Sequence, residues 1–94
     1  MDENYNYGLD VHQTLLDIND HIAELQLALG EKEEAMKLFE RSYKVRKTQP
    51  PNDNLLLCLS NLTQIYLELE YFDDSKRIAN EFMKYESLMG IKDE

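Results

Sequence analysis

The chain has 94 residues, 43% of them hydrophobic, and its 19 Asp and Glu outnumber its 10 Lys and Arg to give a net charge of −9 at pH 7. This length allows a single domain with a thin core. The negative charge argues against direct binding to nucleic acid or to an anionic membrane, because both require a cationic protein surface, and it favours a basic partner.

An amphipathic helix is expected over residues 10–29, after a flexible leader at residues 1–9. Apolar side chains recur there in steps of three and four, which places them on one stripe of the helix. The stripe consists of Val11, Leu15, Ile18, Ile22, Leu25 and Leu29. Gly30 is expected to end the helix, because glycine readily adopts the left-handed conformation that follows many helices.

A second helix is expected over residues 32–47. Acidic residues lie in its first turn and basic residues in its last, an order that suits the helix macrodipole. Its inner face holds Ala35, Leu38, Phe39 and Ser42. Two prolines among polar turn residues then break the pattern at residues 48–53, and an Asn or Asp there offers a cap for the next helix.

A third helix, about 54–69, has a broad apolar face that must be covered on two sides. This face holds Leu55, Cys58, Leu59, Leu62, Ile65, Tyr66 and Leu69. A fourth helix, about 73–89, follows after a short turn and presents Ile78, Ala79, Phe82, Met83 and Tyr85. Because short connections make successive helices antiparallel, the predicted fold class is all-α, with four helices in two pairs.

The pattern of the chain repeats after forty residues. This shift places Ile22 on Leu62, Leu29 on Leu69, Glu34 on Asp74 and Ala35 on Ser75. Repetition of both position and chemistry predicts two copies of one helix-turn-helix unit.

The repeated residues resemble those of the tetratricopeptide repeat. The second copy matches its pattern at Asn61, Leu62, Tyr66, Leu69, Phe72, Asp74 and Ser75, and the first at Ala23, Leu29, Gly30, Glu34 and Ala35. The spacing is similar to the longer variant in kinesin light chains and bacterial peptide-sensing regulators. The resemblance implies a short right-handed superhelix with repeats at 10–48 and 53–90, a domain spanning 10–90, and a tail at 91–94. It also implies that Ala23, Ala35 and Ser75 lie where helix axes approach most closely, and Glu70 replaces the turn glycine of the repeat.

The resemblance also implies a binding groove lined by the first helix of each repeat. The residues that it assigns to this groove are Asp17, Asp20, Glu24, Leu27, Leu57, Ser60, Asn61, Gln64, Leu67 and Glu68. Lys and Arg are absent from residues 1–31 and 48–75, whereas residues 32–47 hold six of the ten. The groove is therefore expected to be anionic. The sequence predicts a non-catalytic adaptor for a basic protein or peptide. The alternative is that these carboxylates only solvate exposed helix faces.

Two other classes of function fit the same sequence. One is an acidic inhibitor that imitates nucleic acid and occupies the basic channel of another protein. The other is a self-associating structural subunit, a homodimer or part of a larger assembly, that covers the apolar ends of the stack through Phe82, Leu88 and Met89 or through Val11 and Leu15.

The residue types that carry most enzyme chemistry form no recognisable motif in this chain. His12 and His21 are nine residues apart, a spacing that does not suit a metal site, and His21 is expected to fill a helix-packing position. Cys58 lies among leucines and is expected in the core. We therefore predict no enzyme, cofactor or metal. With a single cysteine and no apolar run of about 20 residues, the sequence predicts a cytoplasmic protein without a membrane span.

Overall fold

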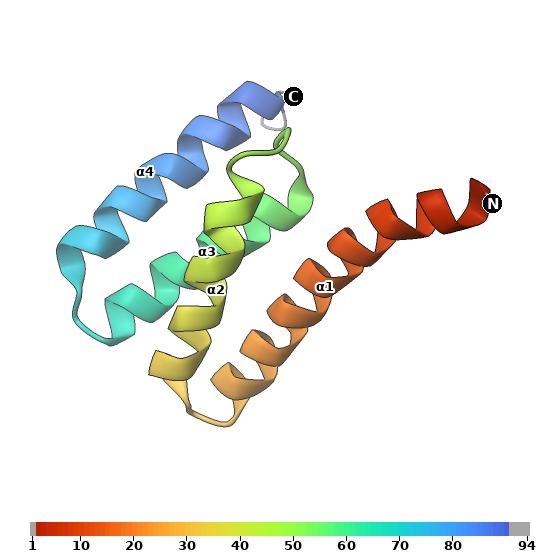
Figure 1. Cartoon of the computed structure of the whole chain (residues 1–94). Helices are drawn as coiled ribbons and strands as arrows, with labels where there is room; N and C mark the ends of the chain where they lie inside the picture. Colours follow the sequence, from red (N-terminus) through yellow and green to blue (C-terminus); the bar gives the residue numbers. More distant parts are fainter. Residues whose placement is uncertain (1, 91–94) are drawn as a thin grey trace.

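The computed structural model describes residues 2–90, and side chains from His12 onward. The described residues form four helices and no strand, which confirms the predicted all-α class, and Figure 1 shows how the helices are arranged. They are α1 (Asp2–Ala28), α2 (Lys32–Arg46), α3 (Asp53–Glu68) and α4 (Phe72–Met89). All helix ends lie within one residue of those predicted, except the start of α1. The predicted tail at 91–94 lies outside the described residues.

Helix α1 begins eight residues earlier than predicted, so residues 2–9 are helical where a flexible leader was expected. Two features of the sequence suit this extension. No proline precedes Pro50, and acidic residues at the first positions complement the positive end of the helix dipole. The added turns extend beyond the other three helices (Figure 1).

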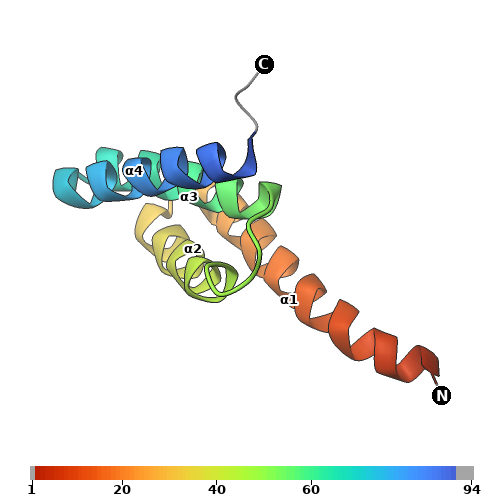
Figure 2. The same cartoon turned by 90° about the horizontal axis from the view of Figure 1, so that it is seen from above.

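Each helix packs against its neighbours in chain order. Contacts join α1 to α2, α2 to α3 and α3 to α4, and Figure 2 shows the resulting two pairs from above. The core lies around α3, where Leu55, Cys58, Leu59, Leu62 and Ile65 are at most 1% exposed. The predicted broad apolar face of α3 is thus covered by α2 on one side and α4 on the other.

The turns within the two helix pairs are equivalent after a shift of forty residues. In the first turn the Glu31 amide donates to the Gln26 carbonyl at 2.8 Å, and in the second the Tyr71 amide donates to the Tyr66 carbonyl at the same distance. Gly30 has a φ of 85°, and Glu70, at the matching position, has a φ of 66°. A side chain in this left-handed conformation is strained, whereas glycine is not.

Small residues allow close approach inside each pair. Ala23 and Ala35 are fully buried, and Ser75 is 8% exposed, at the positions where the sequence predicted such contacts. The Ser75 hydroxyl donates to the Thr63 carbonyl of α3 at 2.9 Å, which satisfies a polar group inside the contact. Asn52 caps α3 as expected, because its side-chain oxygen accepts from the Leu55 amide.

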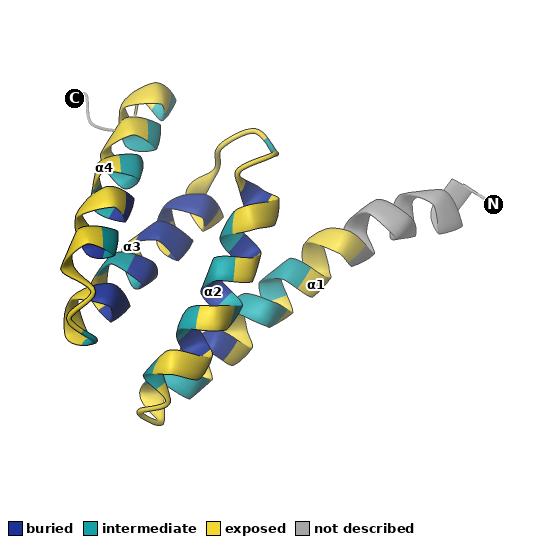
Figure 3. Ribbon diagram, turned by 60° about the vertical axis from the view of Figure 1, so that its left-hand side comes forward, coloured by how far each residue is buried: buried dark blue, intermediate teal, exposed yellow. Residues whose placement is uncertain are grey.

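The apolar stripe of α1 does not face α2. Helix α1 meets α2 through Ala23, through Leu27 and through Asn19, whose side-chain amide donates to the Leu38 carbonyl. From Leu15 onward the stripe is exposed on another face of α1, and only Leu15 borders α2, at a cavity that it shares with Arg41 and Val45. Figure 3 shows the contrast, with α3 largely buried and the described part of α1 largely exposed or intermediate.

We predict that Glu70→Gly stabilises the protein, because glycine relieves a left-handed conformation that costs a side chain about 1 kcal/mol. The reverse change, Gly30→Glu, is expected to lower the free energy of unfolding by about the same amount. A Cβ at position 30 meets no atom within 4 Å, so backbone strain alone is tested there. Urea unfolding followed by circular dichroism measures both effects, and equal stability of wild type and Glu70→Gly would contradict the prediction.

Candidate functional site

A buried arginine joins the two helices of the first repeat. Arg46 of α2 is 1% exposed, and its Nη2 donates to Asp17 Oδ1 at 3.1 Å and to Asp20 Oδ2 at 2.8 Å, both on α1. Its Nε donates to the Ser42 hydroxyl one turn earlier, at 3.0 Å. A cation removed from water in this way requires anionic partners. Asp17 and Asp20 therefore have a structural role, because they hold α1 to α2 through Arg46.

A groove lies between α1 and α3, the two helices that the resemblance assigns to a binding surface. It encloses a cavity of 190 Å³, with Phe39 and Cys58 among its lining residues. Five of the ten predicted residues line this cavity, namely Asp17, Asp20, Glu24, Leu57 and Asn61. His21 and Asn54 also line it. The arrangement places carboxylates along one side of an apolar depression, and no Lys or Arg is among its described lining residues.

The other five predicted residues do not line this cavity. Leu27 packs against the core, and Leu67 is exposed beyond the cavity. Ser60 and Gln64 turn toward α4 and line a different cavity of 260 Å³, together with Phe82 and Met83. The ten residues therefore do not share one cavity, because successive positions on α3 point partly toward α1 and partly toward α4. Their assignment to a partner-binding surface stays a prediction.

Glu68 belongs to a separate contact at the end of α3. It accepts a hydrogen bond from Gln64 at 2.9 Å and pairs with Lys32 of α2 at 3.3 Å. The bond from Gln64 and then the bond from Lys32 hold the pKa of this carboxyl below its ordinary value. Its charge is already partly neutralised, so Glu68 adds little to the anionic character of the groove.

His21 was expected to pack between helices, and this was wrong. Its side chain is exposed and lines the groove. The signal was present in the sequence, because His21 follows Asp17 by four residues and precedes Glu24 by three, which places all three on one face of α1.

Cys58 lies under the groove, and its thiol is not reactive. The thiol donates to the Phe39 carbonyl at 3.2 Å, and burial raises its pKa to about 12, with a further contribution from Asp20. Nucleophilic attack requires the thiolate. Cys58 therefore serves packing between α2 and α3, as the sequence predicted.

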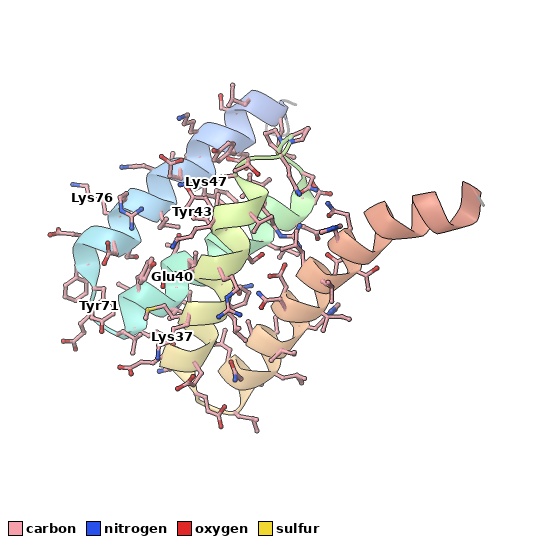
Figure 4. All side chains as sticks on the ribbon, viewed as in Figure 1. Lys37, Glu40, Tyr43, Lys47, Tyr71 and Lys76 are labelled. Carbon is pink, nitrogen blue, oxygen red and sulfur yellow. The ribbon has the colours of Figure 1, made fainter. Side chains whose placement is uncertain are left out.

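A second, basic cleft lies between α2 and α4, on the side away from the groove. Its cavity has a volume of 440 Å³ and is lined by Lys37, Glu40, Arg41, Tyr43, Lys44, Lys47, Tyr66, Arg77 and Ile78. Figure 4 labels four of these residues along α2. Burial raises the pKa of Tyr66, and its hydroxyl donates to Glu40, so this carboxylate is already bonded. The two clefts thus have opposite charge.

Comparison with family models, with curated proteins and with solved structures gives no match to this chain. The resemblance to tetratricopeptide repeats remains a prediction that rests on the residues quoted for it. None of the described helices has the length and apolar character needed to cross a membrane. Among the described side chains, from His12 to Gly90, no three His, Cys, Asp or Glu are grouped so as to hold a metal ion.

We predict that Asp17→Asn combined with Asp20→Asn destabilises the protein by about 3 kcal/mol, because Arg46 then keeps a buried charge without an anion. Adding Arg46→Met, which removes that charge, is expected to restore much of the loss. Urea unfolding measures the three variants, with Glu24→Gln as a control that changes stability by less than about 0.5 kcal/mol. Wild-type stability in the double variant would show that Arg46 does not depend on these carboxylates.

We also predict that the free energy of unfolding falls as pH rises from about 9 toward 12, in part because of Cys58. The thiol keeps its proton in the folded state up to a pKa of about 12, whereas in the unfolded chain it loses the proton near its ordinary value of 9.0. The contribution is fully present below pH 9 and is reduced by about 1 kcal/mol at pH 10. Unfolding curves from pH 8 to 10.5 check this, and Cys58→Ala should show a smaller decline than wild type.

Proposed function

We propose that this protein is a non-catalytic interaction module, built from two tetratricopeptide-like repeats, that binds a basic segment of another protein in the groove between α1 and α3. The turn equivalence between the helix pairs supports the repeat assignment. A reducing, cytoplasmic setting is part of the proposal, since the single cysteine is a buried free thiol.

One observation carries this function: the groove combines an apolar depression with carboxylates on one side. Leu57 is 56% exposed at its edge and offers contact area, while Glu24 is an exposed anion beside it. A Lys or Arg side chain fits such a surface well, because its aliphatic stem packs on apolar atoms while its charged end reaches the carboxylate. Since Asp17 and Asp20 share their charge with Arg46, Glu24 is the principal anion left for a partner.

The basic cleft makes an inhibitor that imitates nucleic acid a weaker alternative. Such a mimic must present anionic groups along the surface that enters a cationic channel. Here five cationic side chains gather on the α2 and α4 side of the molecule. The cationic cleft interrupts any continuous anionic surface on this side of the molecule, whereas the groove between α1 and α3 has no Lys or Arg among its described lining residues, which suits a local binding site.

We predict that Glu24→Lys combined with Asn61→Lys removes the binding partner. Both side chains line the groove and neither bonds to Arg46, so the change tests binding without disturbing the buried ion pair. The measurement is affinity purification from the native cell, followed by quantitative mass spectrometry. Recovery of the specific partner is expected to fall about tenfold, because the new lysines repel a basic segment.

The matched control is Glu34→Lys combined with Asn80→Lys, which makes the same change of net charge at exposed positions of α2 and α4. This variant should recover the partner as wild type does. Equal recovery by the groove variant and wild type would reject the groove as the binding site, and equal loss in both variants would attribute binding to net charge alone.

A further inference from the structure

Helix α1 presents an uncovered row of large aliphatic side chains, separate from the groove. Leu15, Ile18, Ile22, Leu25 and Leu29 recur in steps of three and four, and they are between 44% and 74% exposed. Single exposed apolar residues are common on proteins, but a continuous row along one helix is typical of an interface. We refer to these five residues as the α1 stripe.

The internal repeat shows what normally covers such a surface. Forty residues later, the equivalent positions on α3 are Leu55, Cys58, Leu62, Ile65 and Leu69. The first four are at most 1% exposed, and α2 lies against them, as the bond from Cys58 to the Phe39 carbonyl shows. The same stripe is therefore covered by a helix on α3 and bare on α1. A helix that packed on α1 in the orientation that α2 has on α3 would cover the exposed stripe.

A cavity at one end of the α1 stripe offers a place for an anchoring side chain. It has a volume of 290 Å³ between α1 and α2 and is lined by His12, Leu15, Leu16, Asn19, Arg41 and Val45. Val45 is itself 40% exposed. Interface anchors are commonly apolar side chains that fill such cavities at the edge of an apolar surface. A Leu or Phe of a docked helix would bury Leu15 and Val45 together.

The charge of α1 distinguishes between possible occupants. Residues 1–31 contain no Lys or Arg, and the face of α1 next to the stripe, about 100° around the helix, carries Asp17, which bonds to Arg46, and Glu24, which does not. A second copy docking through α1 would bring another acidic helix, so the charges of the two copies would repel. The helix that covers α3 is by contrast cationic, since residues 32–47 hold six of the ten basic residues.

We infer that the α1 stripe binds a cationic amphipathic helix of another polypeptide, which packs on α1 as α2 packs on α3. Its apolar face covers Ile18 and Ile22 and fills the cavity beside Leu15. Its Lys or Arg residues lie toward Glu24, the carboxylate on this side of α1 that does not bond to Arg46. This surface is distinct from the groove between α1 and α3, so one molecule can engage a partner through both.

The test uses a synthetic helix-forming peptide of about 20 residues, long enough to be helical, with Leu at helical spacing and Lys on both flanks. One control peptide has Glu in place of every Lys, and another has the same composition in scrambled order. Fluorescence anisotropy measures binding to the full chain. The Lys-flanked peptide should bind at least tenfold more tightly than either control, because only this peptide matches both the stripe and its acidic border.

The decisive variant is Ile18→Glu combined with Ile22→Glu. Both side chains are exposed, so the fold should be retained, which circular dichroism verifies. The affinity of this variant for the Lys-flanked peptide should be at least tenfold lower than that of wild type. The control variant, Leu67→Glu combined with Leu88→Glu, alters two exposed leucines outside the stripe and should bind as wild type does. Because Glu24 contributes to both surfaces, Asn61→Lys alone, which changes the groove and leaves α1 intact, tests the proposed function separately.

Three results would overturn the inference. Failure of the Lys-flanked peptide to bind, or equal binding by the scrambled peptide, would show that the stripe does not recognise such a helix. Unchanged affinity in the Ile18 and Ile22 variant would place the site elsewhere. Sedimentation velocity provides the third: a wild-type dimer that becomes a monomer in this variant would identify a second copy as the occupant.

Discussion

The broad apolar face of α3 must be covered on two sides, and the rest of the structure depends on the contact that α2 makes with it. Phe39 and Cys58 meet at the centre of this contact, and Tyr66 bonds across it to Glu40. Helix α1 touches the core mainly through α2, by small side chains and by the ion pair of Arg46. The groove therefore exists because α2 holds α1 and α3 apart, and Phe39 lies between its walls.

Repetition of a sequence pattern does not guarantee repetition of surroundings. Ile22 and Leu62 occupy equivalent positions in equivalent helices, yet Ile22 is 44% exposed and Leu62 is fully buried. The difference lies in the neighbours, since α2 packs against this face of α3, whereas none of the described helices covers it on α1. In a repeat protein each unit leaves an apolar face for its neighbour. If the proposed repeat assignment holds, the α1 stripe corresponds to such a face.

Most of the fold follows from local rules that the sequence displays. Periodicity located the helices, Asn52 and Gly30 marked their ends, and the small residues Ala23, Ala35 and Ser75 identified the close contacts. The candidate site was harder to predict from the sequence, because it depends on which neighbouring helix each helix face contacts. In the sequence, Arg46 looks like an ordinary cation in the last turn of a helix. No nearby residue pattern indicated that the small side chain of Ser42, one turn earlier, would allow Arg46 to be buried. Likewise, the spacing of Ser60 and Gln64 did not show that they turn toward α4.

The burial of Arg46 also changes the meaning of the charge pattern. Acidic residues on α1 and basic residues on α2 first serve the packing of these two helices, so the sorting of charge by helix is partly structural. The carboxylates that remain are those that Arg46 does not reach, above all Glu24, which lies on α1 beside both the groove and the stripe. A partner that contacts either surface meets an anion that the fold itself does not neutralise. The electrostatic preference for a basic partner is therefore set by what is left after internal pairing, and not by the net charge of the chain.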